Sequence, residues 1–254
     1  MPTPFAFTAI TPPRCRPFGN YLNSNLMINF AKIQPVGEQA VQFYFPLPLQ
    51  ADYPALINAL AQRAKALGAV DVVPAYHSLL IVCGNGESAK PLAFYVEQLS
   101  DYLPSAYDSV HAQPPARHVR IPVCYDAEFA PDLERVAQQH QLSPEAVIDK
   151  HLQSTYTVCC LGFIPGFAFM GYVDDDIATP RLDNPRSLVA RGSVGIAGKQ
   201  TGIYPIDSAG GWNIIGRSPQ TLYAPDKQLI SCFDIGDSVS FYRISREAFD
   251  DWQA

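Results

Sequence analysis

The C-terminal half of this sequence is built from short β-prone segments, and this pattern constrains the fold more than any other feature. After His151, apolar runs of a few residues alternate with glycine and proline as far as the final segment "IGDSVSFYRIS". Many short strands at close spacing are typical of a closed or sandwich-like β structure. We therefore expect a β-barrel or a β-sandwich in this half.

The preceding residues predict a smaller α+β unit. From residue 30 to about residue 103 the pattern is strand, strand, helix, strand, strand, helix, and the first helix is expected between Asp52 and Gly68. Residues 104–117, "PSAYDSVHAQPPAR", lose this periodicity and contain three prolines, which indicates a linker. Two helices are expected before the β region, the second of them capped by Ser143 with Pro144 at its first position.

The first residues do not fit this organisation. They lack the charged and apolar regions of a secretory signal, and the first strand-like pattern starts at Met27. We interpret residues 1–26 as a tail or a misplaced translation start, residues 27–103 as the N-terminal α+β domain, residues 104–117 as a linker and residues 118–254 as the β domain.

The composition limits the classes of partner. Hydrophobic residues make up 48% of the chain and charged residues 17%, which excludes a disordered protein. No run of about 18 apolar residues occurs, so no membrane span is expected. A net charge of -6 without a basic block argues against nucleic acid or an anionic membrane as partner. Six cysteines without zinc spacing predict reduced thiols and a cytoplasmic location.

The sequence lacks complete versions of the common cofactor-binding motifs. The segment "SVGIAGKQ" has Ser193 where a phosphate-binding loop needs glycine, and Gln200 where it needs serine or threonine. The consecutive residues Asp174, Asp175 and Asp176 are expected in a solvated turn rather than around a cation, because neighbouring side chains diverge. We predict no metal site and no nucleotide site within this chain.

Residues 192–217 are the first candidate for a functional site, because they hold seven of the sixteen glycines. Crowding of glycine usually reflects tight turns or close approach of the backbone to a bound molecule. We expect the bends of this stretch to line one concave face, with Trp212 as a packed wall rather than a stacking platform. The expected groove residues are Phe163, Pro165, Gly166, Gly192, Gly195, Gly198, Gly202, Gly210, Gly211 and Trp212.

Three arginines flank or close this stretch. Arg181 and Arg186 each follow a proline, and guanidinium groups on stiff turns suit capture of a carboxylate or phosphate. An alternative for both is that they fix loops by bonding to backbone carbonyls or to Asp183. The third, Arg217, closes the stretch. His151 ends a predicted helix, either as a structural histidine or as a catalytic one.

Three segments carry a family resemblance. "LGFIPGFAFMGYV", "TPRLDNPRSLVARGSVGIAGKQTGIYPIDSAGGWNIIGRSPQTLY" and "IGDSVSFYRIS" resemble the family of 5-oxoprolinase B subunits, also known as PxpB or KipI and as allophanate hydrolase subunit 1. The resemblance covers about residues 28–245 and is strongest over residues 161–223. Two positions depart from the family pattern: residues 189–192 are Val-Ala-Arg-Gly instead of Val-Pro-Ala-Gly, and His77 stands where arginine is usual.

The resemblance implies an α+β fold class, with a small α+β N-terminal domain followed by a cyclophilin-like β-barrel. It also implies a carboxyltransferase-type pair with a PxpC/KipA-like subunit. Together with a PxpA-like subunit, the complex would open the cyclic amide 5-oxoproline to glutamate with ATP, which has no recognisable site in this chain. Inhibition of a histidine kinase, as by KipI, and a carboxyltransferase role in urea or allophanate metabolism remain alternatives.

The resemblance also suggests roles for the candidate residues. Backbone N–H groups of the glycine-rich walls would approach the substrate, an arginine would hold its carboxylate, and Gln200 and Tyr204 would orient its amide. The residues expected to take part in catalysis are Arg181, Arg186, Gln200, Tyr204, Arg217 and His151.

Overall fold

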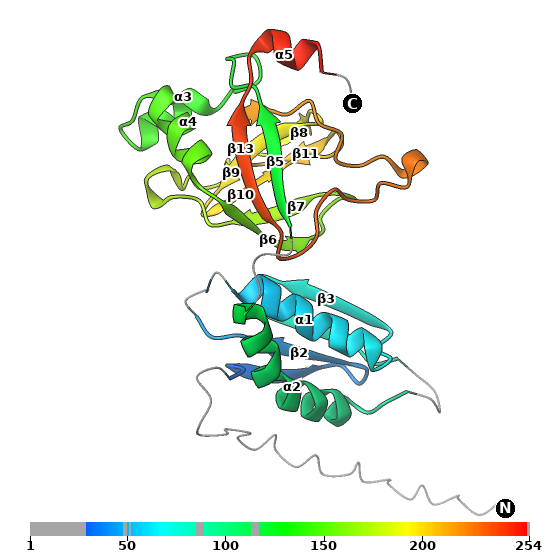
Figure 1. Ribbon diagram of the computed structural model, residues 1–254. Helices are drawn as coiled ribbons and strands as arrows, with labels where there is room; N and C mark the ends of the chain where they lie inside the picture. Colours follow the sequence, from blue (N-terminus) through cyan, green and yellow to red (C-terminus); the bar gives the residue numbers. More distant parts are fainter. Residues whose placement is uncertain (1–28, 48–49, 51, 85–88, 113–116, 253–254) are drawn as a thin grey trace, which may run out of the picture.

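The structure, a computed structural model, describes residues 29–47, 50, 52–84, 89–112 and 117–252. The predicted tail at residues 1–26 lies outside the described residues. Residues 29–112 form a sheet covered by helices, here called the sheet unit, and residues 117–252 form a barrel, here called the barrel unit. The barrel unit lies above the sheet unit in Figure 1.

The sheet unit is a four-stranded antiparallel sheet in the order β1-β2-β4-β3. Its strands show the period of two that a half-buried strand requires: Val41 and Phe43 on β2, and Leu79 and Ile81 on β4, are fully buried. Two helices lie across the sheet in Figure 1, and their apolar residues join the same core. The elements are β1 (Lys32–Val36), β2 (Ala40–Tyr44), α1 (Tyr53–Ala66), β3 (Asp71–Ala75), β4 (Ser78–Val82) and α2 (Leu92–Ala112). Their order is the one that the sequence predicts.

Helix α2 corrects one prediction. Residues 104–112 were expected in a linker, but they form the second half of this helix, which contains Pro104. Leu99, Leu103 and Ala106 follow helical spacing and are almost fully buried in the sheet unit. The burial of this stripe offsets the cost of a proline inside a helix, which is about 3 kcal/mol. Residues 113–116 lie outside the described residues.

The barrel unit is a seven-stranded sheet that nearly closes on itself. Its strand order is β12-β9-β10-β7-β6-β13-β5, and only β5 and β13 run parallel. Cys124, just after β5, exchanges two backbone hydrogen bonds with Arg217 at the end of β12, which joins the two outer strands. This barrel fits the expected cyclophilin-like fold. The strands are β5 (His118–Val123), β6 (Tyr156–Leu161), β7 (Ala168–Gly171), β9 (Ser193–Ala197), β10 (Gln200–Ile203), β12 (Asn213–Arg217) and β13 (Ser238–Arg243).

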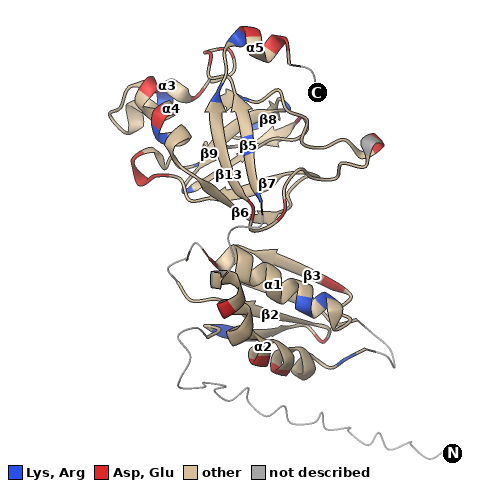
Figure 2. Ribbon diagram, viewed as in Figure 1, with Lys and Arg blue, Asp and Glu red and all other residues tan. Residues whose placement is uncertain are grey.

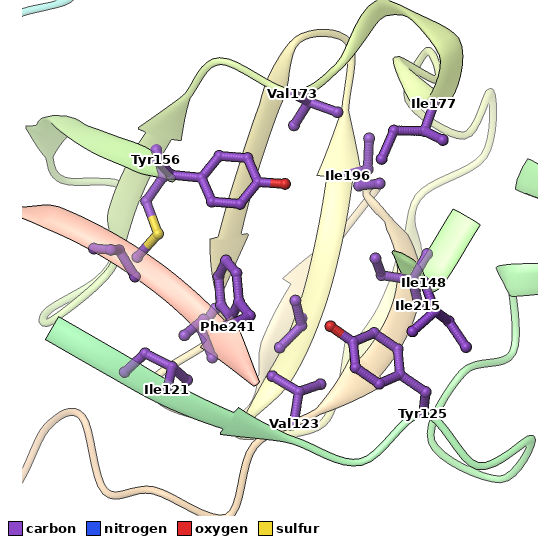
Figure 3. Close-up of a cluster of buried hydrophobic side chains, with 14 of the residues drawn as sticks. Ile121, Val123, Tyr125, Ile148, Tyr156, Val173, Ile177, Ile196, Ile215 and Phe241 are labelled. Atoms are coloured by element: carbon purple, nitrogen blue, oxygen red, sulfur yellow. The ribbon is translucent and has the colours of Figure 1, made fainter. Parts of the chain in front are cut away.

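Apolar side chains fill the barrel. Ile121, Ile196, Ile215 and Phe241, from four different strands, point toward one another in Figure 3 and are at most 4% exposed. Two helices add to this core, α3 (Leu133–Gln139) and α4 (Pro144–Gln153). The start of α4 is as predicted, because the Ser143 side chain accepts a hydrogen bond from the Ala146 N–H at 3.2 Å. The smaller elements are η1 (Asp175–Ile177), β8 (Arg186–Val189), β11 (Ser208–Gly210), η2 (Pro225–Lys227) and α5 (Arg246–Asp250).

The two units are in contact. Asn58 Nδ2 on α1 donates to the carbonyl oxygen of Ile235 at 3.2 Å, and Tyr172 Oη donates to the carbonyl oxygen of Gln50 at 3.3 Å. Strand β3 and helix α1 both approach β6. Both units carry charged residues of both signs along the ribbon in Figure 2. The two hydrogen bonds and the approach of α1 and β3 to β6 join the two units.

Candidate functional site

The outer face of the barrel carries a packed group of aromatic residues, here called the outer aromatic cluster: Phe167, Tyr204 and Trp212. These side chains are 1%, 1% and 4% exposed. The Phe167 ring meets the Tyr204 ring at a centroid distance of 5.4 Å and the Trp212 ring at 5.5 Å, both edge to face. This geometry is the favoured one for aromatic pairs, so the cluster is a second core outside the barrel. Trp212 is a packed wall, as the sequence suggests.

The glycines of the barrel strands make room for this cluster. Gly195 on β9 and Gly202 on β10 are paired in register. A Cβ atom at Gly202 would lie 2.9 Å from the Ala168 carbonyl oxygen and 3.3 Å from Trp212, and one at Gly195 would lie 3.1 Å from Trp212. At Gly210 it would lie 2.3 Å from the Tyr204 hydroxyl. The glycines therefore permit close packing of the protein's own rings.

This packing corrects the expectation of one concave face along residues 192–217. Gly192 lies in a turn with φ +82°, and a Cβ atom there would meet the Ser218 carbonyl oxygen at 2.2 Å. A Cβ atom at Gly211 would touch Pro185 at 3.5 Å, and one at Gly166 would lie 2.9 Å from Tyr223. These glycines pack against the protein's own atoms, and the sequence does not reveal this because tight packing and close ligand approach both favour glycine.

The loop between β6 and β7 borders the outer aromatic cluster. It holds Phe163, Pro165 and Gly166. Phe163 is 63% exposed, and its ring meets Phe167 edge to face at 5.6 Å. The loop thus extends the cluster to the surface.

Two predicted arginines have structural partners. Arg186 Nη2 lies 2.6 Å from Oδ1 of Asp132, a nearly buried carboxylate that also accepts from the Ile214 N–H. Arg217 Nε donates to the Arg191 carbonyl oxygen at 2.9 Å, beside the strand pairing that closes the barrel. For Arg186, loop fixing is therefore the interpretation that the contacts support, with Asp132 in place of Asp183.

Arg181 differs from these two, because it is exposed. Its guanidinium lies 5.9 Å from the centre of the Trp212 ring, within the range of a cation–π contact. It remains accessible to a ligand or a partner at the rim of the outer aromatic cluster.

His151 lies inside the barrel and is fully buried. Its Nδ1 is 2.9 Å from the Tyr125 hydroxyl, its Nε2 is 3.1 Å from the Thr201 hydroxyl, and its ring stacks on Phe241. Burial lowers the pKa of His151 to about 3, so the imidazole is neutral. The contacts support the structural interpretation of His151, because a side chain without exposed surface does not reach a bound substrate.

A pocket between the two units contains the remaining candidates. Two hairpin turns form it: residues 75–78 at the β3–β4 turn of the sheet unit and residues 197–200 at the β9–β10 turn of the barrel unit. Tyr172, just after β7, completes the lining of this interunit pocket, whose volume is about 730 Å³. Small-molecule sites commonly have this size and this location between domains. Gln200 and Gly198 are the predicted site residues that line it.

Several polar side chains that line the pocket have no hydrogen-bond partner among the described residues. Within the described part of the chain, the side chains of Gln200, His77 and Ser78 make no hydrogen bond. Lys199 Nζ lies 2.6 Å from Oδ1 of Asp175, but both side chains are mostly exposed. Gly198, with φ +59°, has no atom within 4 Å of the position where a Cβ atom would stand. This turn of the glycine-rich stretch is therefore the open one.

Two cysteines, Cys159 and Cys160, lie near the pocket residue Tyr76. Burial raises the pKa of Cys159 to about 12 and that of Cys160 to about 11, and it also raises the pKa of Tyr76. Both thiols are therefore protonated at neutral pH, and a protonated thiol is a poor nucleophile. The five described cysteines are free, as the sequence predicts. The described residues contain no cluster of three or more side chains suited to a metal ion. The pocket is suited to binding and orienting a ligand.

Sequence reasoning missed the half of the pocket that belongs to the sheet unit. Residues 75–78 lie more than 100 residues before Gln200, and nothing in their spacing announces a site. His77 was singled out only as a departure from the family pattern. Lys199 lies between the predicted residues Gly198 and Gln200, whereas Tyr172 lies apart from the predicted residues in the sequence and has no motif of its own.

Comparison with known proteins decides the family. The family model "Carboxyltransferase domain, subdomain C and D" matches residues 31–233. The chain is 36% identical over 229 residues to the 5-oxoprolinase B subunit of Bacillus subtilis strain 168, an alignment that covers 86% of this chain and 95% of that protein. The chain belongs to the family of 5-oxoprolinase B subunits.

Solved structures of similar proteins support the fold. A conserved uncharacterized protein of Pyrococcus horikoshii, PH0987, is 40% identical with a TM-score of 0.52, covering 86% of this chain and 100% of that one. TTHA0988 is 32% identical with a TM-score of 0.68, covering 81% of this chain. This chain spans 40% of TTHA0988. A putative urea carboxylase of Emericella nidulans is 22% identical, and the match covers 67% of this chain and 17% of that protein.

Proposed function

We propose that the chain is the B subunit of an ATP-dependent 5-oxoprolinase, which opens 5-oxo-L-proline to L-glutamate. The near full-length match to the 5-oxoprolinase B subunit of Bacillus subtilis carries this proposal. The name of that relative implies a multi-subunit complex, and we propose PxpA-like and PxpC/KipA-like chains as the partners, in the cytoplasm. Among the described helices, none has the length and apolarity of a membrane span.

The structure suggests a division of labour in that complex. Hydrolysis of a lactam requires activation of its carbonyl group, for which phosphorylation by ATP and positioned donors are suitable means. In this chain His151 is buried and the thiols of Cys159 and Cys160 are protonated, so none of these three groups is placed to activate the lactam. ATP and the activating groups would then come from the partner subunits or from a site shared with them.

The roles expected for the six catalytic candidates divide accordingly. We propose that Gln200 contacts substrate and that exposed Arg181 remains available to substrate or to a partner subunit. The contacts of Arg186, Tyr204, Arg217 and His151 support structural roles for these four residues.

Reconstitution of the complex tests the function. The chain is co-expressed with PxpA-like and PxpC-like subunits, and glutamate release from 5-oxoproline is measured with and without ATP. We expect ATP-dependent glutamate release that is lost when this chain is left out. A stable three-subunit complex that releases no glutamate would contradict the proposal.

The two alternatives are tested by the same preparation. The likeness to a urea carboxylase gives weak support to a carboxyltransferase role, so the complex is also assayed with urea, bicarbonate and ATP. Inhibition of a histidine kinase stays a prediction, and autophosphorylation of a sporulation kinase in the presence of the isolated chain measures it.

A further inference from the structure

Polar groups with unused hydrogen-bonding capacity converge on the interunit pocket. Gln200 comes from the barrel unit, and His77 and Ser78 come from the sheet unit. Each has donor or acceptor atoms without a partner among the described residues. The aromatic rings of Tyr76 and Tyr172 supply apolar walls between them. A few convergent polar groups on an otherwise apolar lining are the usual composition of a small-molecule site.

The charge of the pocket limits its ligand. Of the nine lining residues, Lys199 alone is a lysine or arginine. Its pair with Asp175 is a surface pair, with side chains 63% and 74% exposed, and such pairs contribute little to stability. A ligand carboxylate therefore competes readily for the ammonium group. One available cation suits one carboxylate and does not suit a triphosphate.

The carboxamide of Gln200 has a shape that matches a cyclic amide. It offers an N–H donor and a C=O acceptor side by side. In a five-membered lactam the ring holds the amide cis, so its N–H and C=O also lie on the same side and can form two parallel hydrogen bonds with a carboxamide. An open-chain amide is trans and presents the two groups on opposite sides. The product glutamate has no amide in its side chain.

We propose that the interunit pocket binds the lactam of 5-oxoproline, with the Gln200 carboxamide pairing with its N–H and C=O groups and Lys199 holding its carboxylate. The substrate identity rests on the proposed function, whereas the cis-amide preference rests on the pocket. The sheet unit thereby supplies one wall of the substrate site. The pocket of about 730 Å³ is larger than a single five-membered ring, so it leaves space beside the lactam.

Direct titration of the full chain tests the pairing. The probes are 5-oxo-L-proline, N-methyl-5-oxo-L-proline, which has lost the N–H donor, and L-proline, which lacks the ring carbonyl and carries a protonated ring nitrogen. Binding is followed by calorimetry or by NMR chemical shifts. We expect the first probe to bind at least about tenfold more tightly than the other two, since each lost hydrogen bond also leaves a polar group of the pocket unpaired.

Two variants locate the site. Gln200→Leu removes the carboxamide, and we expect it to weaken 5-oxoproline binding at least about tenfold. Gln153→Leu, the same change at an exposed position on α4, serves as the control and should bind as the parent chain does. Gln200→Glu replaces the amide donor with an acceptor at nearly constant shape, so it should also weaken 5-oxoproline binding. This variant tests the pairing even if the leucine variant does not fold.

The reconstituted complex separates this inference from the proposed function. If the parent complex releases glutamate and Gln200→Leu and Gln200→Glu leave its KM for 5-oxoproline unchanged, the pocket assignment is overturned and the function stands. If the parent complex is inactive while the full chain binds 5-oxoproline through Gln200, the pocket assignment stands and the function fails. Equal affinity of the full chain for the lactam and its N-methyl derivative would overturn the pairing.

Discussion

Gly198 and Gly202 lie four residues apart in one β-hairpin and have opposite surroundings. A Cβ atom at Gly198 would meet no atom within 4 Å, whereas one at Gly202 would press on a backbone carbonyl and on two aromatic rings. The first glycine belongs to the interunit pocket and the second to the outer aromatic cluster. A single glycine-rich stretch therefore serves a tight turn beside open space at one end and dense packing at the other.

The largest expected effect is on stability, and it comes from a substitution in the outer aromatic cluster. Trp212→Ala removes the largest ring of the outer aromatic cluster, and we expect a loss of about 3–5 kcal/mol in the free energy of unfolding. Urea denaturation measures it. Phe163→Ala, at the exposed rim of the same cluster, should cost less than about 1 kcal/mol. Equal costs for the two variants would show that Trp212 is not packed as described.

A matched pair of glycine substitutions sharpens the comparison within the hairpin. Gly202→Ala forces a methyl group against the Ala168 carbonyl oxygen, and we expect a cost of about 2–3 kcal/mol. Gly198→Ala meets no atom and carries only the strain of its positive φ, about 1 kcal/mol. Both are measured by thermal and urea unfolding. If Gly198→Ala were the more costly, the turn beside the pocket would not be open.

The barrel core should lose stability in acid through His151. Folding lowers the pKa of His151 to about 3, so its contribution to stability is present above the unfolded pKa of about 6.5 and is lost as the pH falls toward 3. Between pH 7 and pH 5 this loss amounts to about 2 kcal/mol, because only the unfolded state takes up the proton in that window.

A variant isolates this contribution. His151→Gln removes the titrating group, so its free energy of unfolding should depend less on pH than that of the parent chain between pH 7 and pH 5. Urea unfolding at several pH values checks the difference. Identical pH profiles for the two chains would mean that His151 is not buried in the neutral form.

The smallest expected effect is at the rim of the pocket. Asp175→Asn removes the exposed partner of Lys199 and should change stability by less than about 1 kcal/mol. The freed ammonium group should bind 5-oxoproline about two- to fivefold more tightly. Asp226→Asn, in the exposed η2 turn, is the control. Weaker binding by Asp175→Asn would contradict the role given to Lys199.

Local signals in the sequence predicted much of the fold. Ser143 followed by Pro144 marks a helix start through groups that are adjacent in the chain, and the structure has a capped helix there. The prolines of residues 104–117 led to the wrong prediction of a linker, because the contacts that decide the structure there are distant in the chain. Pro104 disfavours a helix locally, while the burial of Leu103 and Ala106 in a core made by distant strands decides the outcome.

The candidate site was harder to predict than the fold. Glycine has two uses, and the sequence does not separate Gly198 beside a pocket from Gly195 and Gly202 beneath aromatic rings. The pocket itself depends on contact between two turns more than 100 residues apart, which no local pattern encodes. The partner of Arg186 is likewise a carboxylate 54 residues earlier in the chain.

The parallel pairing of β5 with β13 has a consequence for folding of the barrel during synthesis. These neighbours are the first and the last of its seven strands along the chain, and β13 also joins β5 to β6. More than 100 residues must be synthesised after β5 before its neighbour β13 is available for pairing. Until then the backbone N–H and C=O groups on the edge of β5 that faces β13 have no strand partner, and such an edge can pair with other chains.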